Sequence, residues 1–435
     1  MNENNPVWYP FTHLKISDEP IKISRGEGAY LYDDQGNAFF DAVSSWWVNL
    51  YGHRHPAIVD AIKNQLDSLD HVLFADFTHN PAEELAKKLL EINNHCFSKV
   101  FFSDNGSTAV EVAIKLSLQY YSNLYGQKRS KIIAFTNSYH GDTFGAMSAG
   151  ARSVFSEPFS HLFFDVQRFD YPSTWIGDVT VEKKENVIIT SIRKYIEENN
   201  DDIACLIIEP LVQGAGGMNM CRPDFLQKLD LICKEFKVLV IYDEIMTGFG
   251  RTGEVFAYQK ANTNPDMICL SKGITGGFLP LSVTLTTQNV FKAFYSDDKT
   301  HTFFHGHSYT ANPISCSAAI ASTNLIKSFE NDRKRIELFY KSRIDQLLNF
   351  DLIEKVRVSG TILAFDIKST NNSNYLNPIG LELKKKMLKK GYLLRPLGNT
   401  VYIMPTYVST NKVLGQLLDD LVNFIRSFYM AEQCS

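Results

Sequence analysis

The chain has 435 residues, 44% of them hydrophobic, which is enough for two domains or for one large and one smaller domain. With 44 basic and 48 acidic residues the formal net charge is -4, so nothing favours binding to nucleic acid or to an anionic membrane surface. The N-terminal segment lacks a basic region followed by an apolar one, and no apolar stretch approaches the ~18 residues that a membrane helix needs. We therefore expect a cytoplasmic protein that acts on small molecules.

Cysteine and histidine spacing gives no metal-binding pattern. The seven cysteines are scattered without a C-x-x-C pair, and most stand in apolar surroundings that are typical of buried thiols. The pairs His53/His55 and His305/His307 have a spacing that suits a metal on a strand, but no third ligand is near either pair in sequence. We expect no metal site.

The first 45 residues or so combine an aromatic opening, WYPF at 8–11, with short strands separated by turns, such as 29–32 before DDQG. This predicts a small meander. Next comes SSWWVNLYGHRHP, residues 44–56, before a helix expected at 57–69. Trp46 and Trp47 could both lie in the core, but neighbouring residues in irregular chain point in different directions, so we expect at least one to face a cleft.

From about residue 82 helices and strands alternate. The expected strands cover residues 99–102, 131–135, 203–208, 238–242, 267–270 and 281–287. Such alternation predicts an α/β fold with a mostly parallel sheet. Because ligands of these sheets gather at the carboxyl ends of the strands, the residues just after each strand are the candidate site residues.

Two of these strands deliver an acid and a lysine. The apolar run 238–242 leads to Asp243, and the run 267–270 leads to Ser271 and Lys272, followed by three glycines. A desolvated lysine can form a Schiff base with an aldehyde cofactor, and the acid suits the ring nitrogen of a pyridinium. The pair indicates pyridoxal phosphate, although helix caps and surface ion pairs also use such residues.

Other strand ends offer further groups. Gly106 and Ser107 precede an amphipathic helix whose Thr108-x-x-Glu111 matches a capping box, so the free N–H groups could seat a phosphate. Tyr139, after the strand 131–135, could stack on a planar ring.

Beyond these, Glu209 ends the strand 203–208, and Ser308 stands in an aromatic loop where it could cap a helix or bind phosphate. Arg395 precedes a strand and could clamp a carboxylate or lie on the surface.

The last hundred residues predict a small α+β domain, with strands near 356–360, 363–367 and 401–404 and helices near 380–389 and 414–430. We expect three parts: residues 1–48 as an N-terminal segment joining the small domain, 49–312 as the large cofactor-binding domain, and 313–435 as the small domain.

Together these segments resemble the class III (omega-amino acid) aminotransferases of fold type I, over essentially the whole chain. The most specific motifs are DEIMTGFGRTG at 243–253 and SKG at 271–273. Within the family, WYPFT at 8–12, SSWW at 44–47, YHGDTFGAMS at 139–148 and LRPLG at 394–398 resemble members that convert 8-amino-7-oxononanoate to 7,8-diaminononanoate in biotin biosynthesis.

The resemblance implies a role for each candidate residue. Lys272 forms the Schiff base and shuttles the proton, and Asp243 keeps the pyridinium nitrogen protonated. Phosphate is bound by Gly106 and Ser107, with His307 and Ser308 reaching over from the second subunit of a homodimer. Position 308 often holds threonine in the family, and a hydroxyl is kept here.

For the substrate, the resemblance implies that Tyr139 covers the cofactor ring and lines the pocket with Trp46. Gly306 and Arg395 would contact the oxononanoate, and Arg251 is another candidate for its carboxylate.

Phe11 bears on the amino donor. Many family members that use S-adenosylmethionine have tyrosine here, so one hydroxyl is lost, which is worth only ~0.5 to 1.5 kcal/mol. We expect S-adenosylmethionine as the donor, with lysine as the alternative. Two other interpretations are a different omega-aminotransferase and a cofactor-binding regulator, but such regulators carry a DNA-binding domain, for which this chain has neither spare length nor a basic face.

Overall fold

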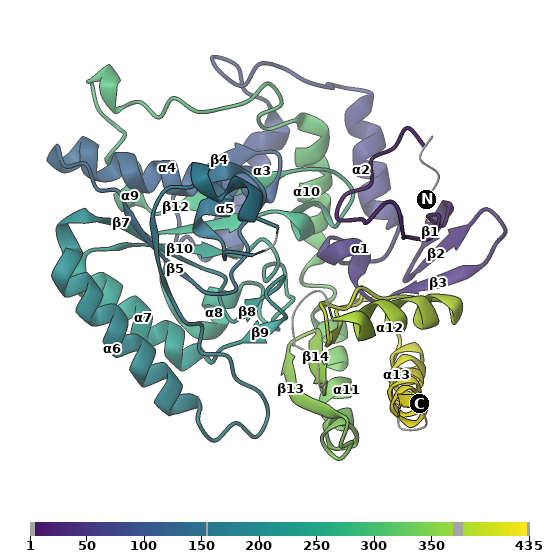
Figure 1. Cartoon of the computed structure of the whole chain (residues 1–435). Helices are drawn as coiled ribbons and strands as arrows, with labels where there is room; N and C mark the ends of the chain where they lie inside the picture. Colours follow the sequence, from purple (N-terminus) through teal and green to yellow (C-terminus); the bar gives the residue numbers. More distant parts are fainter. Residues whose placement is uncertain (1–4, 154, 369–376, 433–435) are drawn as a thin grey trace.

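The structure, a computed structural model, describes residues 5–153, 155–368 and 377–432, and a seven-stranded sheet lies at its centre (Figure 1). In spatial order its strands are β4 (Lys99–Ser103), β12 (Ser282–Thr286), β11 (Met267–Leu270), β10 (Leu239–Asp243), β7 (Ile203–Ile208), β5 (Lys131–Phe135) and β6 (Val166–Phe169). The five strands from β11 to β6 pair in parallel, whereas β12 is antiparallel to both of its neighbours. The expected α/β fold with a mostly parallel sheet is confirmed. The sequence did not predict β6, a short edge strand of which three residues are only half-buried.

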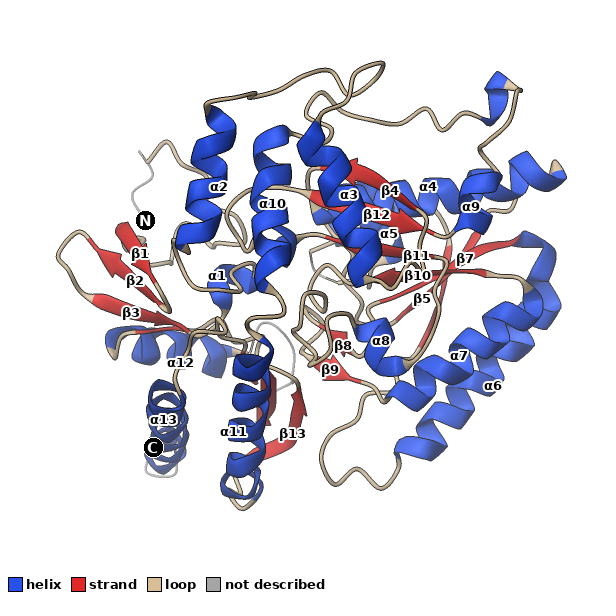
Figure 2. Ribbon diagram, turned by 180° about the vertical axis from the view of Figure 1, so that it is seen from behind, coloured by secondary structure: helices blue, strands red, loops and turns tan. Residues whose placement is uncertain are grey.

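Helices cover both faces of this sheet (Figures 1 and 2). One face packs against α4 (Gly106–Tyr125), α5 (Phe144–Ala149) and α9 (Gln288–Lys292). The other packs against α3 (Asn80–Ile92), α6 (Val181–Asn199), α7 (Pro223–Phe236), α8 (Ala257–Ala261) and α10 (Pro313–Leu325), with α2 (Pro56–Leu66) beside α10. Along β10, Leu239 and Ile241 belong to the first core and Val240 and Tyr242 to the second, so the strand is buried on both faces and only its carboxyl end reaches the site.

A second, smaller group of elements follows in sequence. Strands β13 (Ile353–Ser359), β14 (Ile362–Ile367) and β16 (Thr400–Ile403) form an antiparallel sheet, accompanied by α11 (Glu330–Leu348), α12 (Pro378–Lys389) and α13 (Asn411–Glu432). Helix α11 is not apparent from the sequence, because only four of its 19 residues are buried and its apolar periodicity is weak.

The two ends of the chain share one sheet. Strands β1 (Ile23–Glu27), β2 (Tyr30–Asp33) and β3 (Ala38–Asp41) form an antiparallel meander, and β15 (Tyr392–Leu393) adds to β3 in parallel. A two-stranded ribbon, β8 (Val212–Gln213) with β9 (Asn219–Met220), lies nearer the main sheet. The three-part division of the chain stays a prediction.

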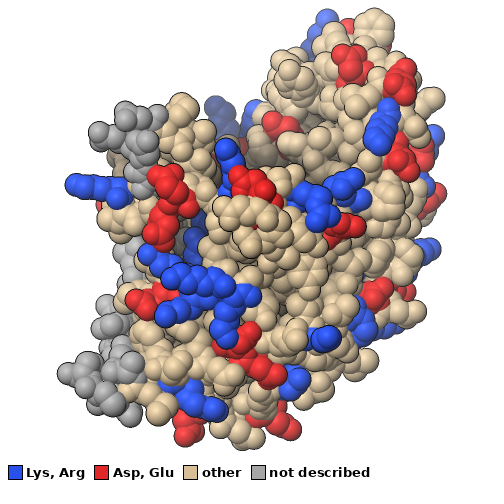
Figure 3. Space-filling view, turned by 90° about the vertical axis from the view of Figure 1, so that its right-hand side faces the viewer, with Lys and Arg blue, Asp and Glu red and all other residues tan. Residues whose placement is uncertain are grey.

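The surface carries mixed charge. On the face shown in Figure 3, basic and acidic side chains are interspersed, with one basic group near its middle that acidic side chains border. Among the described residues, none of the helices has the length and apolarity needed to span a membrane.

Candidate active site

Lys272 stands two residues after the end of β11, and burial lowers the pKa of its amine from 10.5 to about 8, with the carboxylates of Asp243 and Glu209 acting in the opposite direction. Its Nζ lies 4.5 Å from the ring centroid of Trp47. A lysine that is neutral in a substantial fraction of molecules near pH 8 is a competent nucleophile, as imine formation requires.

Asp243 ends β10 with its carboxylate fixed on two sides. Oδ1 accepts a hydrogen bond from the backbone N–H of Ile245 at 3.1 Å, and Oδ2 lies 2.7 Å from Nδ1 of His140. Both members of the Asp243–His140 pair are almost fully buried. An acid held in this way keeps lone pairs free for a further donor, such as a ring N–H.

Tyr139 stands after β5 with 37% of its surface exposed. Its backbone N–H donates to Oε2 of Glu209 at 3.0 Å, and Oε1 of the same carboxylate accepts from Gly214 at 2.9 Å. Burial raises the pKa of Glu209 to about 7, opposed by His140. Burial, helped by the nearby carboxylate of Asp142, also raises the pKa of the Tyr139 phenol, which therefore stays protonated and able to donate. Sequence reasoning gave Glu209 no role, and here it anchors the backbone of Tyr139.

The start of α4 differs from the predicted capping box. The N-cap is Asn105, whose side chain accepts from the Thr108 N–H at 3.1 Å while Thr108 Oγ1 accepts from the Asn105 N–H at 3.3 Å. The Thr108–Glu111 pairing was therefore wrong. Glu111 instead accepts from the N–H of Gly145 at 2.8 Å, at the start of α5, because a carboxylate at this point of α4 faces free N–H groups of the neighbouring helix.

Gly106 and Ser107 form the first turn of α4, and the backbone around them is closely packed. A Cβ on Gly106 would lie 2.9 Å from Ile245, and one on Gly141 would lie 2.0 Å from Ser107 Oγ, which also accepts from the N–H of Asp142 at 3.1 Å. Glycine at both positions therefore lets these backbone segments pack against Ile245 and Ser107 without a steric clash.

Three of the residues predicted to bind substrate come together. The guanidinium carbon of Arg395 lies 4.1 Å from the ring centroid of Trp46, and the Trp46 ring meets that of Phe11 edge-on at 5.6 Å. Phe11 also contacts Phe155 at 5.9 Å. All of these side chains are partly exposed, and Arg395 donates no hydrogen bond within the described residues, so its guanidinium is free to pair with a carboxylate.

Arg251 does not lie with them. It is 1% exposed, and its guanidinium donates to the backbone carbonyls of Pro405 at 2.8 Å and Asn49 at 2.9 Å. A substrate carboxylate cannot reach a guanidinium enclosed in this way, so the expectation that Arg251 contacts substrate disagrees with the structure. The GFGRTG pattern that suggested it is a turn that buries its arginine.

The loop holding Gly306, His307 and Ser308 is exposed at its two outer residues and runs along the outside of the chain. The carbonyl of Ser308 accepts from Nε2 of His71 at 2.6 Å, and no hydrogen bond among the described residues joins the loop to Ser107 or Lys272. Within the described part of one chain, therefore, these residues make no hydrogen bond to the predicted phosphate seat.

Trp47 is the residue whose role the sequence did not reveal. Unlike Trp46 it is buried, its indole N–H donates to the hydroxyl of Tyr402 at 3.0 Å, and its ring faces Lys272. Both tryptophans belong to α1 (Ser44–Trp47), whose four residues all have left-handed φ, at 51°, 47°, 70° and 75°. At about 1 to 2 kcal/mol per residue, this turn stores several kcal/mol of backbone strain.

Comparison with known proteins agrees with this geometry. Residues 14–425 match the family described as "Aminotransferase class-III". The chain belongs to the class III aminotransferases. Curated relatives named adenosylmethionine-8-amino-7-oxononanoate aminotransferase include one from Synechococcus elongatus, 50% identical over 93% of this chain and 94% of its own, and one from Helicobacter pylori, 34% identical over 96% and 95%.

Solved structures of aminotransferases superpose closely. The enzyme of the same name from Methanocaldococcus jannaschii is 35% identical, with a TM-score of 0.89 over 97% of both chains. An amine transaminase from an uncultivated Pseudomonas species, in a PLP-bound form, is 28% identical, with a TM-score of 0.88 over 98% of both chains.

The family implies pyridoxal phosphate, and the residues of this site fit it. Lys272 supplies an amine of lowered pKa, and Asp243 supplies a fixed carboxylate for the ring nitrogen. The first backbone N–H groups of α4, at Gly106 and Ser107, could bind the phosphate, and Tyr139 offers a partly exposed ring after β5.

Proposed function

We propose that this chain converts 8-amino-7-oxononanoate to 7,8-diaminononanoate, a step of biotin biosynthesis, with bound pyridoxal phosphate. The observation that carries the proposal is that one short turn, Ser44–Trp47, places Trp47 against Lys272 and Trp46 against the partly exposed Arg395 and Phe11. The relatives named for this substrate support the choice of acceptor. Both substrates are small metabolites, and we expect the reaction to take place in the cytoplasm.

When bound, the cofactor withdraws electrons from the substrate carbon that bears nitrogen, so that a C–H proton becomes acidic. Lys272 is placed to hold and return that proton at Nζ, because its amine titrates near neutral pH. Asp243, held by the buried His140, would offer its carboxylate to the ring nitrogen. Tyr139, protonated and anchored through Glu209, would cover the ring and offer its phenol as a donor.

At the substrate end, Arg395 would bind the carboxylate of the oxononanoate in bidentate fashion. Trp46 and Phe11 would pack on its methylene chain, and each buried CH₂ contributes about 0.8 kcal/mol. Arg395, stacked on Trp46, is oriented before substrate arrives, so less conformational entropy is lost on binding.

We propose S-adenosylmethionine as the amino donor, with lysine as the second candidate because position 11 is phenylalanine. The test is to incubate the holoenzyme with oxononanoate and either donor, and to measure diaminononanoate by mass spectrometry. We expect product with S-adenosylmethionine. Product with lysine and none with S-adenosylmethionine would overturn the choice of donor. Phe11→Tyr would then show whether the missing hydroxyl is the cause. If neither donor gives product while other omega-amino compounds do, the chain is a different omega-aminotransferase.

We further propose a homodimer in which His307 and Ser308 complete the phosphate site of the second subunit. Support comes from large apolar side chains that stand exposed on and near their loop, namely Leu66, Leu73, Phe77, Phe304 and Tyr309. Serial dilution followed by light scattering and cofactor absorbance tests this proposal. Cofactor should be released as the dimer dissociates, whereas a monomer that retains its cofactor would contradict it.

A further inference from the structure

The left-handed turn Ser44–Trp47 contains no glycine, although every one of its residues has φ between 47° and 75°. Such a run is strained for side chains with a Cβ, so contacts outside the turn must hold it in place. The turn begins three residues after the end of β3 and carries two tryptophans, one against Lys272 and one against Arg395.

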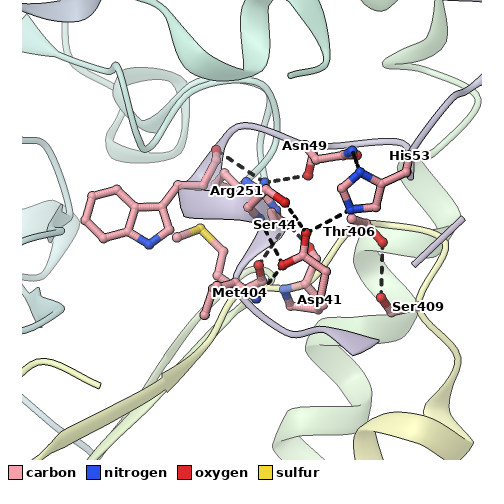
Figure 4. Close-up of polar contacts among 12 residues, drawn as sticks. Asp41, Ser44, Asn49, His53, Arg251, Met404, Thr406 and Ser409 are labelled. Carbon is pink, nitrogen blue, oxygen red and sulfur yellow. Dashed lines mark hydrogen bonds and ion pairs between the residues drawn. The ribbon is translucent and has the colours of Figure 1, made fainter. Parts of the chain in front are cut away.

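One buried carboxylate supplies two of these contacts, both to Ser45. Asp41, the last residue of β3, is fully buried, and its Oδ1 accepts from the backbone N–H of Ser45 at 2.9 Å. Its Oδ2 accepts from Ser45 Oγ at 2.7 Å and lies 3.0 Å from Nε2 of His53. His53 in turn lies 3.1 Å from the side chain of Asn49 (Figure 4). The Asp41 carboxylate therefore binds Ser45, the second residue of the turn, through both the main chain and the side chain of Ser45.

The rest of the turn is tied to its surroundings at both ends. Ser44 Oγ donates to the carbonyl of Met404 at 2.8 Å, and the enclosed guanidinium of Arg251 donates to Asn49 just beyond the turn (Figure 4). Gly277, in the glycine-rich segment after Lys272, packs so closely that a Cβ there would lie 2.9 Å from Asn49 Cα. The chain just beyond the turn thus packs directly against the segment that follows the lysine.

We propose that Asp41 is a positioning residue of the active site: held by His53, its carboxylate locks the left-handed turn that sets Trp47 against Lys272 and Trp46 against Arg395. The neutral amide analogue would hold the turn less well, because it carries no charge and has one acceptor atom where the carboxylate uses two for the N–H and the hydroxyl of Ser45. Glycine at position 45 would relieve the requirement, since glycine adopts positive φ without a steric penalty.

The test compares Asp41→Asn, Asp41→Asn with Ser45→Gly, and Asp41→Asn with Lys237→Gly. Lys237 is the control because it is also left-handed, at φ 56°, but is exposed at the end of α7. This kinetic comparison rests on the proposed oxononanoate reaction. In that reaction we expect Asp41→Asn to lower kcat/KM about tenfold or more, because charge-assisted hydrogen bonds are lost. Adding Ser45→Gly to Asp41→Asn should raise kcat/KM again by roughly threefold or more. Adding Lys237→Gly should leave kcat/KM at the value of Asp41→Asn. Full activity in Asp41→Asn, or equal rescue by both glycines, would overturn the proposal.

A second readout needs neither substrate nor cofactor. In the cofactor-free protein, hydrogen exchange at the Ser45 amide should be about tenfold faster in Asp41→Asn than in the parent, because its acceptor is weakened. It should slow again when Ser45→Gly is added, and unchanged exchange in Asp41→Asn would overturn the proposal. If the parent makes no diaminononanoate with any donor, the proposed function fails while the exchange rates still decide the role of Asp41.

If Asp41→Asn does not fold, His53→Gln replaces it, since it leaves the carboxylate in place. A lower kcat/KM with faster Ser45 exchange then supports the proposal, and parental values for both contradict it.

Discussion

Lys272→Met should stabilise the cofactor-free protein at neutral pH, even though it abolishes turnover. Burial lowers the pKa of this amine from 10.5 to about 8, which means that folding works against the ammonium form. At about 1.4 kcal/mol for each pH unit, the difference amounts to about 3 kcal/mol. Lys272 keeps partial contact with solvent, so this figure is an upper value. Methionine fills a similar volume without a charge.

Because the pKa of Lys272 is lowered on folding, its effect on stability depends on pH. The penalty is fully present below pH 8, where the amine is protonated in both folded and unfolded chains, and it disappears as pH rises to 10.5. Urea unfolding of cofactor-free protein at pH 7 and at pH 10, at one protein concentration, measures it. The advantage of Lys272→Met should be largest at pH 7 and much smaller at pH 10.

A matched control is Lys260→Met. Burial lowers the pKa of Lys260 too, but this amine donates to the carbonyl of Thr252 at 2.6 Å, so its replacement should destabilise the protein at pH 7. If Lys272→Met is less stable than the parent by the same amount at both pH values, the reasoning about the buried ammonium is refuted.

The remaining predictions concern three other groups. Arg251→Met should lower the free energy of unfolding by roughly 2 to 6 kcal/mol, because the buried carbonyls of Pro405 and Asn49 lose their donor. It should change KM for both substrates alike, and a rise in KM for the oxononanoate alone would show that Arg251 contacts substrate. Arg395→Ala should raise KM for the oxononanoate roughly tenfold or more and KM for the donor much less, and equal effects in steady-state kinetics would show that it only supports the fold. Glu209→Gln should become more stable relative to the parent as pH rises from 4.5 to 7, because ionising the buried carboxylate costs the parent about 3 kcal/mol over that range. If the difference in free energy of urea unfolding does not change with pH, the raised pKa of Glu209 is contradicted.

The sequence predicted the central sheet well because its strands are continuous apolar runs. The predicted ranges 131–135, 203–208 and 267–270 coincide with β5, β7 and β11, and Asp243 and Lys272 follow from the rule that ligands meet at the carboxyl ends of parallel strands. Edge and surface elements such as β6 and α11 escaped because few of their residues are buried.

The parts of the site that the sequence missed depend on distant contacts. Arg251 stands in a conspicuous motif, yet its carbonyl partners include Pro405, more than 150 positions along the chain, so no local pattern could show that it is enclosed. Trp46 and Trp47 point in different directions because of the left-handed turn. Asp41 holds this turn, but in the sequence it looks like an ordinary residue at the end of a strand. Strain of this kind is visible only in backbone geometry.

The most direct test of the account maps where the cofactor is bound and whether both substrates act on it. Holoenzyme is reduced with borohydride and digested, and the lysine that carries the cofactor is identified by mass spectrometry: in the resting enzyme, after incubation with S-adenosylmethionine, and after oxononanoate is then added. We predict attachment at Lys272, its loss with the donor, and its return with the oxononanoate. Attachment at another lysine, or at Lys272 but indifferent to both compounds, would contradict the account.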